Sequence, residues 1–518
     1  MYKLLLCWRY LLTRYIALAS VISVMLGVAT MIVVNAVMLG FTSEMKDRIN
    51  GILADVIFQT YDLNKGFPGY EYHRELILEI AGDLIEELTP TVVVPGMLFY
   101  QIDGVPASFQ VDIVGIDVLT QGKVSKIAEY LQHPENRRNL SFDLRDGGYD
   151  VQGSGDRAPI RRDMGYAGWG YRSWRAAQLK YQQRELQDQQ QASAPAAEDT
   201  EQAYNPFDSS PPLESMLFDM AKEQHAGIIA GIGVSLRYRD PDAVDPETGK
   251  RIVEDHLALL PGDDIMLAFP TVEVSSLKLQ SDKFTVVDLY ESKMADYDRK
   301  LVFVPIEKLQ YLRGMVDADS GQYTITQILI KAKPGVDINE LRDRLRSFFP
   351  PQLFSIKTWQ DEQVDLLNAI RIELGMLNVL LLLIFAVAGF GILAIFYMIV
   401  VEKQKDIGIL KALGASSGGV MQIFLYYSLL LGTIGSALGL GVGLLFVKYI
   451  KEIAWMLSYV LQTEIFSPEI YSFYEIPAVV DFWTVFFIIL GAVLIAVMSG
   501  VFPALRAARV HPVETLRS

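Results

Sequence analysis

Residues that could carry out catalysis are few and scattered in this chain of 518 residues. No G-x-x-x-x-G-K-[ST] motif occurs, and the run Thr248-Gly249-Lys250 has Val244 where the first glycine of a phosphate-binding loop should stand. The five histidines show no metal-binding spacing, and no G-x-S-x-G elbow is present. The single cysteine, Cys7, cannot form an internal disulfide. The sequence therefore predicts no catalytic site, no metal site and no cofactor bound by this chain.

The most specific local pattern is instead the segment 401–416, VEKQKDIGILKALGAS, between two long apolar stretches. As a helix it places Ile407, Leu410 and Gly414 on one stripe. Ile409 and Leu413 lie beside that stripe, and the charged residues lie toward the other side. Helices that only anchor in lipid headgroups are typically rich in Lys and Arg with large aromatic residues, unlike this segment, so the pattern favours contact with a cytoplasmic partner. The residues expected to make this contact are Glu402, Lys403, Lys405, Asp406, Ile407, Gly408, Leu410, Lys411, Leu413, Gly414 and Ala415.

Four uncharged stretches predict the elements that position this segment. Each holds at least 24 residues, and about 20 apolar residues span a bilayer core. Buried helices of a soluble core would show a polar face, which these stretches lack. The first has no A-x-A-like cleavage site, so we expect an uncleaved helix and not a signal peptide. The stretches are Tyr15–Ser43, Leu374–Val401, Ala412–Val447 and Phe482–Leu505.

Charge predicts the orientation of these spans. The chain is 51% hydrophobic with a mean hydropathy of +0.25, yet its formal charge is −15. Residues 1–15, 402–419 and 504–518 together hold nine Lys or Arg against three Asp or Glu, a charge of +6, so the remainder holds −21. Because Lys and Arg favour the cytoplasmic side of the membrane, both termini and the 402–418 segment are predicted to be cytoplasmic.

The predicted fold class is a polytopic α-helical membrane protein with four transmembrane helices and a large α+β extracytoplasmic domain inserted between helices 1 and 2. The predicted order is a cytoplasmic amphipathic N-terminus (1–14), helix 1 (15–43), the extracytoplasmic domain (44–371), helix 2 (372–401), a cytoplasmic helix (402–418), helix 3 (419–448), an extracytoplasmic loop (449–481), helix 4 (482–505) and a cytoplasmic tail (506–518).

Periodicity within the outer region predicts strands mixed with helices at irregular intervals. The strands expected are 55–61, 91–94, 109–115, 284–290, 301–305 and 327–331, and the helices expected are 72–88, 306–315 and 338–349.

Residues 134–215 interrupt this pattern with glutamine-rich and ASAPAAEDTEQAYNPFDSSPP sequence. Such low-complexity sequence cannot bury enough apolar surface to offset its ordering entropy, so we expect an insertion or mobile arm. Its first half interleaves Arg with Trp and Tyr. This pattern leaves two interpretations open, a contact arm for an anionic or protein surface and a poorly ordered insertion.

The segment EKQKDIGILKALGAS closely resembles the cytoplasmic coupling segment of MacB/FtsX-like ABC permeases, especially the lipoprotein-releasing (Lol-type, LolC/LolE) permeases. The ending FPALRAARVHPVETLR (502–517) is similar to the P-A-x-x-A-A-x-x-x-P-x-x-x-L terminus of that superfamily. The first span (9–41), the run 284–315 and Thr358-Trp359 resemble the Lol-type branch. Together these cover most of the chain outside 134–215.

The resemblance implies a permease of the bacterial inner membrane that dimerises with a second copy or a paralogue. Its partner would be a cytoplasmic ABC ATPase (LolD-like) that binds ATP and Mg, and closure of the ATPase would reach the spans through 402–416. The cargo would be a lipoprotein or another amphiphile, taken from membrane lipid and passed to a periplasmic carrier; no nucleic acid is involved.

One permease of that family hooks its carrier with a hairpin, and Thr271–Lys283 corresponds by position. A plain β-hairpin is an equal alternative. The carrier-hook candidates are Ser275, Ser276, Leu277, Lys278 and Leu279.

Small and adaptable residues in the spans suggest two further sites. Gly435, Gly439 and Gly443 recur every four residues and permit close helix packing, either between subunits or within one. In the first span, Asn35 is a strongly polar residue at depth, and methionine adapts its packing to varied acyl chains. The candidates for a substrate cavity are Val28, Met31, Ile32, Asn35 and Met38, although ordinary helix packing explains them as well.

Two other functions stay open at this point. One is an FtsX-like mechanotransmitter that regulates a cell-wall hydrolase, and the other is a MacB-like efflux permease with a split ATPase. The outer region of some 330 residues is larger than is usual for FtsX, and MacB normally carries a fused N-terminal ATPase.

Overall fold

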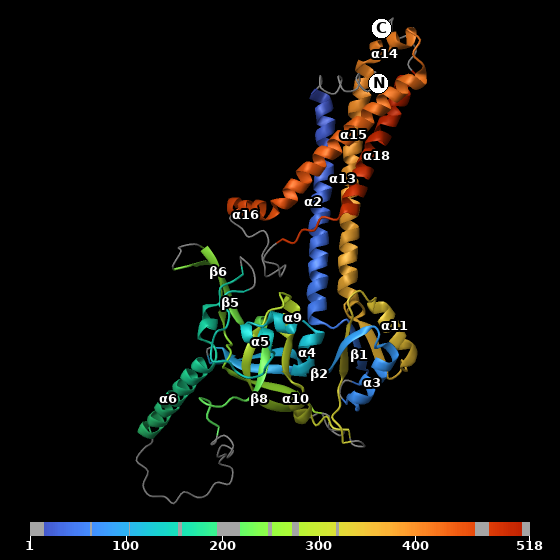
Figure 1. Cartoon of the computed structure of the whole chain (residues 1–518). Coiled ribbons are helices and arrows are strands. Elements are labelled where there is room, and N and C mark those ends of the chain that lie inside the picture. The colour runs from blue at the N-terminus through green and yellow to red at the C-terminus, as the bar shows by residue number, and fades with distance from the viewer. Residues whose placement is uncertain are drawn as a thin grey trace, which may run out of the picture. The chain divides into compact units, whose positions relative to one another are not determined.

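The computed structural model describes residues 15–62, 65–102, 104–153, 158–193, 218–246, 251–271, 279–317, 321–461 and 476–509 (Figure 1). The chain divides into two compact units. The helical unit comprises Met1–Lys46, Val364–Ser467 and Glu475–Ser518, and the α+β unit comprises Asp47–Gln363 and Pro468–Tyr474.

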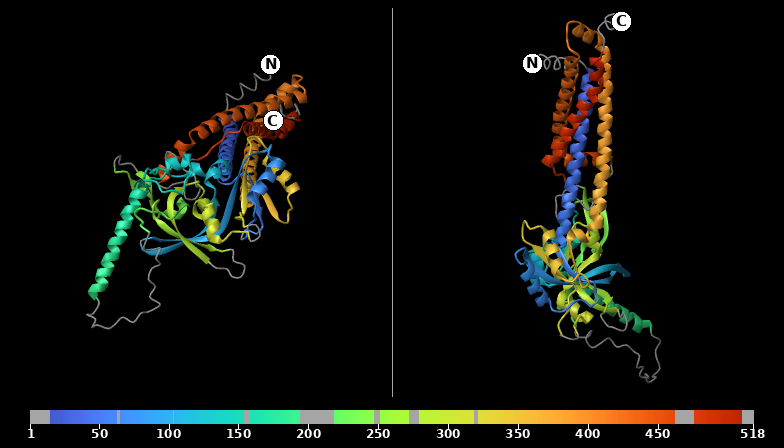
Figure 2. Two further views of the ribbon diagram at one scale, coloured as in Figure 1. Left: turned by 60° about the horizontal axis from the view of Figure 1, so that its bottom comes forward. Right: turned by 90° about the vertical axis from the view of Figure 1, so that its right-hand side faces the viewer.

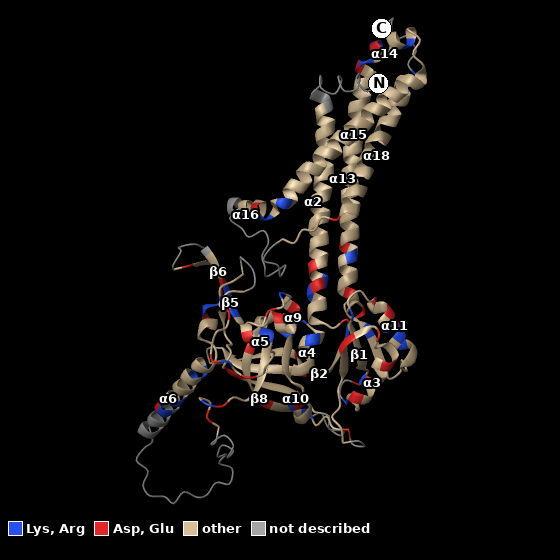
Figure 3. Ribbon diagram, in the orientation of Figure 1, with Lys and Arg blue, Asp and Glu red and all other residues tan. Residues whose placement is uncertain are grey.

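Four long helices dominate the helical unit, and each is long and apolar enough to cross a membrane, as predicted. Helix α18 packs against both α13 and α15 (Figure 2). Few charged residues occur along α15 and α18, whereas the short α14 carries both signs (Figure 3). The helices of this unit are α2 (Tyr15–Ile52), α13 (Val364–Glu402), α14 (Gln404–Ala412), α15 (Ser417–Lys448), α16 (Ile450–Leu461) and α18 (Phe482–Ala508).

Two of these helices extend beyond their predicted apolar stretches. Helix α2 continues past Ser43 to Ile52, and α13 begins at Val364 instead of residue 372. Hydropathy indicates only which part of a helix can lie in lipid, whereas charged residues such as Glu and Lys continue a helix readily. Helix α2 therefore enters the α+β unit without a break.

The α+β unit is built on a nine-stranded sheet in the order β11-β1-β10-β2-β3-β9-β4-β8-β7. The long strand β2 also pairs with β7, so β2, β3, β9, β4, β8 and β7 close into a ring around a buried apolar core. A separate two-stranded ribbon joins β5 to β6. The strands are β1 (Val56–Thr60), β2 (Ile85–Ile102), β3 (Val105–Ile116), β4 (Ala226–Gly231), β5 (Leu236–Val244), β6 (Arg251–Leu257), β7 (Asp264–Pro270), β8 (Leu279–Tyr290), β9 (Leu301–Pro305), β10 (Gln327–Ala332) and β11 (Phe354–Thr358).

Short helices cover the sheet and join its strands. They are α3 (Tyr70–Ala81), α4 (Val118–Val124), η1 (Ile127–Tyr130), α5 (Pro134–Arg138), η2 (Arg162–Tyr166), α6 (Trp169–Ser193), α8 (Ile232–Ser235), α9 (Ala295–Lys300), α10 (Ile306–Arg313), α11 (Ile338–Phe348) and α12 (Trp359–Glu362).

The first strand and the last strand of the sheet hold the entry and exit of the α+β unit together. Strand β1 follows α2 closely, β11 precedes α12 and α13, and Val56 pairs with Thr358 in antiparallel register. Thr358 also begins α12 with a capping box, because its side chain accepts from the Asp361 N–H while Asp361 accepts from the Thr358 N–H.

The predicted helix at 72–88 is wrong in its second half. Helix α3 ends at Ala81, and Gly82 then donates to the carbonyl of Leu78. The residues that follow form β2, where Leu88 lies opposite Ile330. Strand pairing therefore overrides the helical spacing of the apolar residues.

The expectation of an insertion or mobile arm at 134–215 is also wrong for part of this range, because residues between 140 and 176 pack into the unit. Leu140, Phe142 and Leu144 are buried in a cluster with Tyr290. Buried arginines also hold this region through ion pairs, which a hydropathy profile cannot predict. The buried Arg172 pairs with Asp264, with its Nη1 2.7 Å from Oδ1. Residues 194–217, which include the proline-containing sequence, lie outside the described residues.

Candidate functional site

The candidate partner-binding segment forms a distinct short helix, α14, between α13 and α15. Its end is a Schellman turn, in which Ala415 N donates to Leu410 O at 3.0 Å and Gly414 N donates to Lys411 O at 3.1 Å. Gly414 adopts φ +98°, the left-handed conformation that favours glycine. Ser416 then begins α15 by accepting from Gly419 N at 3.1 Å. The LGAS residues therefore fix where α14 stops and α15 starts.

One side of α14 is fixed to the ends of the long helices. Ile407 is buried in a cluster with Val400 of α13, Val420 of α15 and Ala507 of α18. Gly408 is buried beside it. Lys411 Nζ donates to the carbonyl oxygen of Ala508 at 2.7 Å. Since residues from all three neighbouring helices contact α14, a displacement of α14 must be shared by them.

The other side of α14 is exposed and partly apolar. Ile409 is 47% exposed, Leu410 is 41% exposed and Leu413 is 81% exposed. The structure therefore divides the predicted stripe, because Ile407 turns inward while Leu410 and Gly414 face outward. Among the remaining candidates, Glu402, Lys405 and Asp406 are exposed, and Lys403, Lys411 and Ala415 are half-buried.

Ile409 belongs to this exposed apolar surface although it was not among the predicted contact residues. The sequence did place it next to the stripe. Its exposure follows from the burial of Ile407, because two residues along a helix turn a side chain toward the opposite side. We use the name apolar edge for Ile409, Leu410 and Leu413.

The hairpin proposed as a carrier hook is described only in its strands. β7 and β8 are antiparallel, and Pro270 lies opposite Leu279 at the end of their ladder. Leu279 is 78% exposed. The other four candidates, residues 275–278, lie outside the described residues.

The spaced glycines of α15 face α2 of the same chain. A Cβ on Gly435 would lie 2.7 Å from Cβ of Val24, and a Cβ on Gly439 would lie 2.7 Å from Cβ of Val28. The third, Gly443, has Ile32 Cβ at 3.2 Å by the same construction. These distances leave no room for larger residues, so packing within one chain accounts for all three glycines.

Most side chains that were candidates for lining a substrate cavity are instead packed inside the helical unit. Val28 and Ile32 are buried, and Met31 and Met38 are half-buried. Asn35 Nδ2 donates to the carbonyl of Met31 at 3.0 Å, so its amide nitrogen has a partner within the helix.

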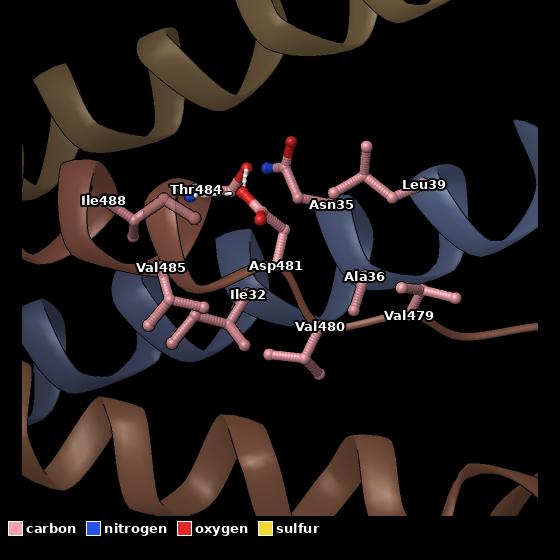
Figure 4. Close-up of a pocket in the computed structure, with 10 residues that line it drawn as sticks. All are labelled: Ile32, Asn35, Ala36, Leu39, Val479, Val480, Asp481, Thr484, Val485 and Ile488. Atoms are coloured by element: carbon pink, nitrogen blue, oxygen red, sulfur yellow. Dashed lines mark hydrogen bonds between the residues drawn. The ribbon is translucent and has the colours of Figure 1, made fainter. Parts of the chain in front are cut away.

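Only two of the five candidates, Ile32 and Asn35, line a pocket at the start of α18 (Figure 4). The space between its lining residues is about 180 Å³, part of which is open solvent. The lining residues are Ile32, Asn35, Ala36, Leu39, Val479, Val480, Asp481, Thr484, Val485 and Ile488.

Comparison with known proteins shows which protein family the helical unit resembles. Residues 378–512 match the model of the FtsX-like permease C-terminal family, a range that contains all of α14, α15 and α18. The apolar edge therefore lies inside the matched range.

Several curated proteins are similar to this chain. The lipoprotein-releasing system transmembrane protein LolC of Xylella fastidiosa is 30% identical over 236 residues, which cover 45% of this chain and 55% of the relative. An uncharacterized ABC transporter permease of Methanocaldococcus jannaschii is 28% identical over 253 residues, covering 46% and 56%. The macrolide export ATP-binding/permease protein MacB of Bdellovibrio bacteriovorus is 25% identical over 256 residues, covering 46% and 35%. The chain spans about half the length of the first two of these relatives.

Proposed function

The chain is a MacB/FtsX-like permease similar to the Lol-type permeases, and we propose that it is the membrane subunit of an ABC transporter driven by a separate ATPase. The ATPase binds ATP and Mg²⁺ and contacts the apolar edge of α14. The permease acts together with a second permease subunit, which is a second copy or a paralogue. The termini and α14 face the cytoplasm of a bacterial cell, and the α+β unit faces the periplasm.

The observation that carries this proposal is the contrast between the two sides of α14. Leu413 is 81% exposed on one side, while Ile407 is 3% exposed on the other. Apolar residues presented on a fixed helix are typical of a helix that seats in the groove of a partner. Because α14 also contacts α13, α15 and α18, force applied to the apolar edge moves the membrane helices.

We propose that the cargo is a lipoprotein, which the transporter extracts from the inner membrane and hands to a periplasmic carrier. Support comes from the similarity to LolC and from the large α+β unit, whose hairpin β7–β8 presents Leu279. Two other functions are supported more weakly. The match to the FtsX-like domain also suits a mechanotransmitter that regulates a cell-wall hydrolase, and the similarity to MacB suits an efflux permease.

Purification of the full chain from its native membrane, followed by mass spectrometry, separates these functions. An ABC ATPase together with trapped lipoproteins supports the proposed function. An ATPase with a cell-wall hydrolase, and without lipoproteins, supports the mechanotransmitter instead. If no ATPase copurifies even after crosslinking, the proposed role of α14 is wrong.

A further inference from the structure

Both ends of the α+β unit are hydrogen-bonded to one short segment, Glu291–Asp298. At the entry, Arg48 in the last turns of α2 donates from Nη1 to the carbonyl oxygen of Lys293 at 3.0 Å. At the exit, Gln363, which immediately precedes α13, donates from Nε2 to Oη of Tyr297 at 2.8 Å. Among the described residues, the chain passes from one unit to the other at Lys46–Asp47 and at Gln363–Val364. The residues next to these two positions are thus connected through Glu291–Asp298.

The end of α2 is held by a second connection to the same segment. The carbonyl of Gly51 accepts from Lys126 N at 2.9 Å, and the Tyr130 hydroxyl contacts Gly51 so closely that a Cβ there has no room. The carbonyl of Tyr130 in turn accepts from Glu291 N at 2.9 Å. Movement of α2 along its axis therefore acts on Glu291 and Lys293 together.

The segment itself is tightly constrained. Lys293 has φ +62°, a conformation that disfavours any residue with a Cβ. Asp298 accepts at Oδ1 from both the backbone N and the hydroxyl of Ser292, at 2.8 and 2.6 Å. An unfavourable backbone conformation persists only where its surroundings over-determine it, and such positions cluster at sites that switch.

A buried ion pair connects the segment to residues 158–193. Arg161 Nη2 lies 2.8 Å from Oε1 of Glu291, and its Nη1 donates to Oε2 at 3.0 Å. The same guanidinium pairs with Asp255, and all three side chains are almost fully buried. Separating a buried pair leaves an uncompensated charge, so the two groups move together. Residues 158–193, which begin the arm that ends in α6, therefore follow Glu291.

We propose that Glu291–Asp298 is the junction that converts displacement of Arg48 against Gln363 into movement of the folded arm at 158–193. Arg48, Tyr297 and Gln363 are positioning residues in this junction. The inference rests on the proposed function only for the source of the motion, because the connections themselves lie within the α+β unit.

Hydrogen–deuterium exchange on the full chain in lipid nanodiscs tests the junction without nucleotide. The double variant Arg48→Met and Tyr297→Phe removes the donors at the entry and the acceptor at the exit while it retains side-chain bulk. Exchange at 158–164 should then accelerate by about fivefold or more. The matched control is Arg344→Met and Tyr100→Phe, which removes an Asp83 ion pair and a hydrogen bond to the Val234 carbonyl in the same unit, outside both the junction and the arm. Wild-type exchange at 158–164 in the double variant overturns the inference.

A second arm adds the ATPase that copurifies with the chain and a non-hydrolysable ATP analogue. In the wild type, exchange should change at α14, at 291–298 and at 158–164, and the double variant should retain only the change at α14. A response at α14 without one at 291–298 overturns the junction but leaves the proposed function standing. Failure of α14 to respond overturns the proposed function, and the nucleotide-free arm then decides on the junction by itself.

Discussion

Lys411 Nζ donates a hydrogen bond of 2.7 Å to the carbonyl oxygen of Ala508 and so joins the last turn of α14 to the end of α18. A lysine near the carbonyl end of a helix satisfies groups that have no partner within the helix. Together with the burial of Ile407, this bond makes α14 part of the helical unit and not a loose loop between two spans.

Replacing Lys411 with Met should weaken this connection. A single intramolecular hydrogen bond contributes about 0.5–1.5 kcal/mol, so the folded chain should survive. We expect ATP hydrolysis by the partner to continue while cargo release per ATP falls several-fold, measured in proteoliposomes. Lys448→Met, an exposed lysine at the end of α15 and outside the predicted contact residues, should behave as the wild type. Equal release by both variants would show that the bond to Ala508 carries no force.

Two glycines near the α14–α15 turn should respond to alanine with opposite signs. Gly414→Ala should destabilise by about 1 kcal/mol because φ is +98° there, although no atom obstructs the new methyl group. Gly418→Ala, inside the first turn of α15 and equally unobstructed, should be neutral or stabilise by up to about 1 kcal/mol. Denaturation of the reconstituted chain measures both. The same sign for the two variants would contradict the Schellman geometry.

The packing of α15 against α2 predicts a contrast within one glycine-rich helix. Gly439→Ala places a methyl group 2.7 Å from Val28 Cβ and should destabilise by about 1–3 kcal/mol. Gly441→Ala meets nothing within 4 Å and should leave stability unchanged or slightly raised. The unfolding midpoints of the two variants, measured in the same detergent, test this contrast. If Gly439→Ala instead lowers only the dimer fraction, these glycines pack between subunits.

The α+β unit should lose stability as the pH rises. Burial, with Glu291 nearby, raises the pKa of Asp298 to about 7, whereas an unfolded aspartate has a pKa of about 3.9. The folded state therefore binds a proton that the unfolded state has released. This contribution is complete below pH about 4 and is lost as the pH rises through about 7.

Asp298→Asn tests this pH dependence because asparagine resembles the protonated acid. Thermal unfolding of the full chain between pH 5 and pH 8 should show a falling midpoint in the wild type and a flatter profile in the variant. Identical slopes would place the pH dependence on another group.

Local patterns predicted much of the secondary structure. The strand at 301–305 and the helix at 306–315 appear as β9 and α10, and the helix at 338–349 appears as α11. In each case the apolar spacing agrees with the tertiary packing. The helix at 72–88 shows the opposite case, because its second half pairs with β10.

Other features depend on contacts that the sequence does not display. The closure of β2 onto β7 joins strands more than 150 residues apart, which no local period encodes. The fold of 134–193 depends on Arg161 and Arg172, whose burial is possible only because Glu291 and Asp264 neutralise them. The spacing of apolar residues identified α14 as an amphipathic helix. It could not show that Ile407 is the residue that turns inward, because this depends on contacts with Val420 and Ala507.

The most direct test of the central claim is the ATP-driven release of a lipoprotein from proteoliposomes that contain the full chain and its copurified ATPase. Leu413→Asp introduces a charge at the apolar edge, where the side chain is 81% exposed, so the fold should persist. Release should fall by at least about tenfold, which corresponds to about 1.4 kcal/mol of lost interaction. Leu119→Asp, equally exposed at 81% but in the α+β unit, should release at the wild-type rate. Undiminished ATP-driven release by Leu413→Asp would contradict the assignment of α14 as the surface that receives the ATPase.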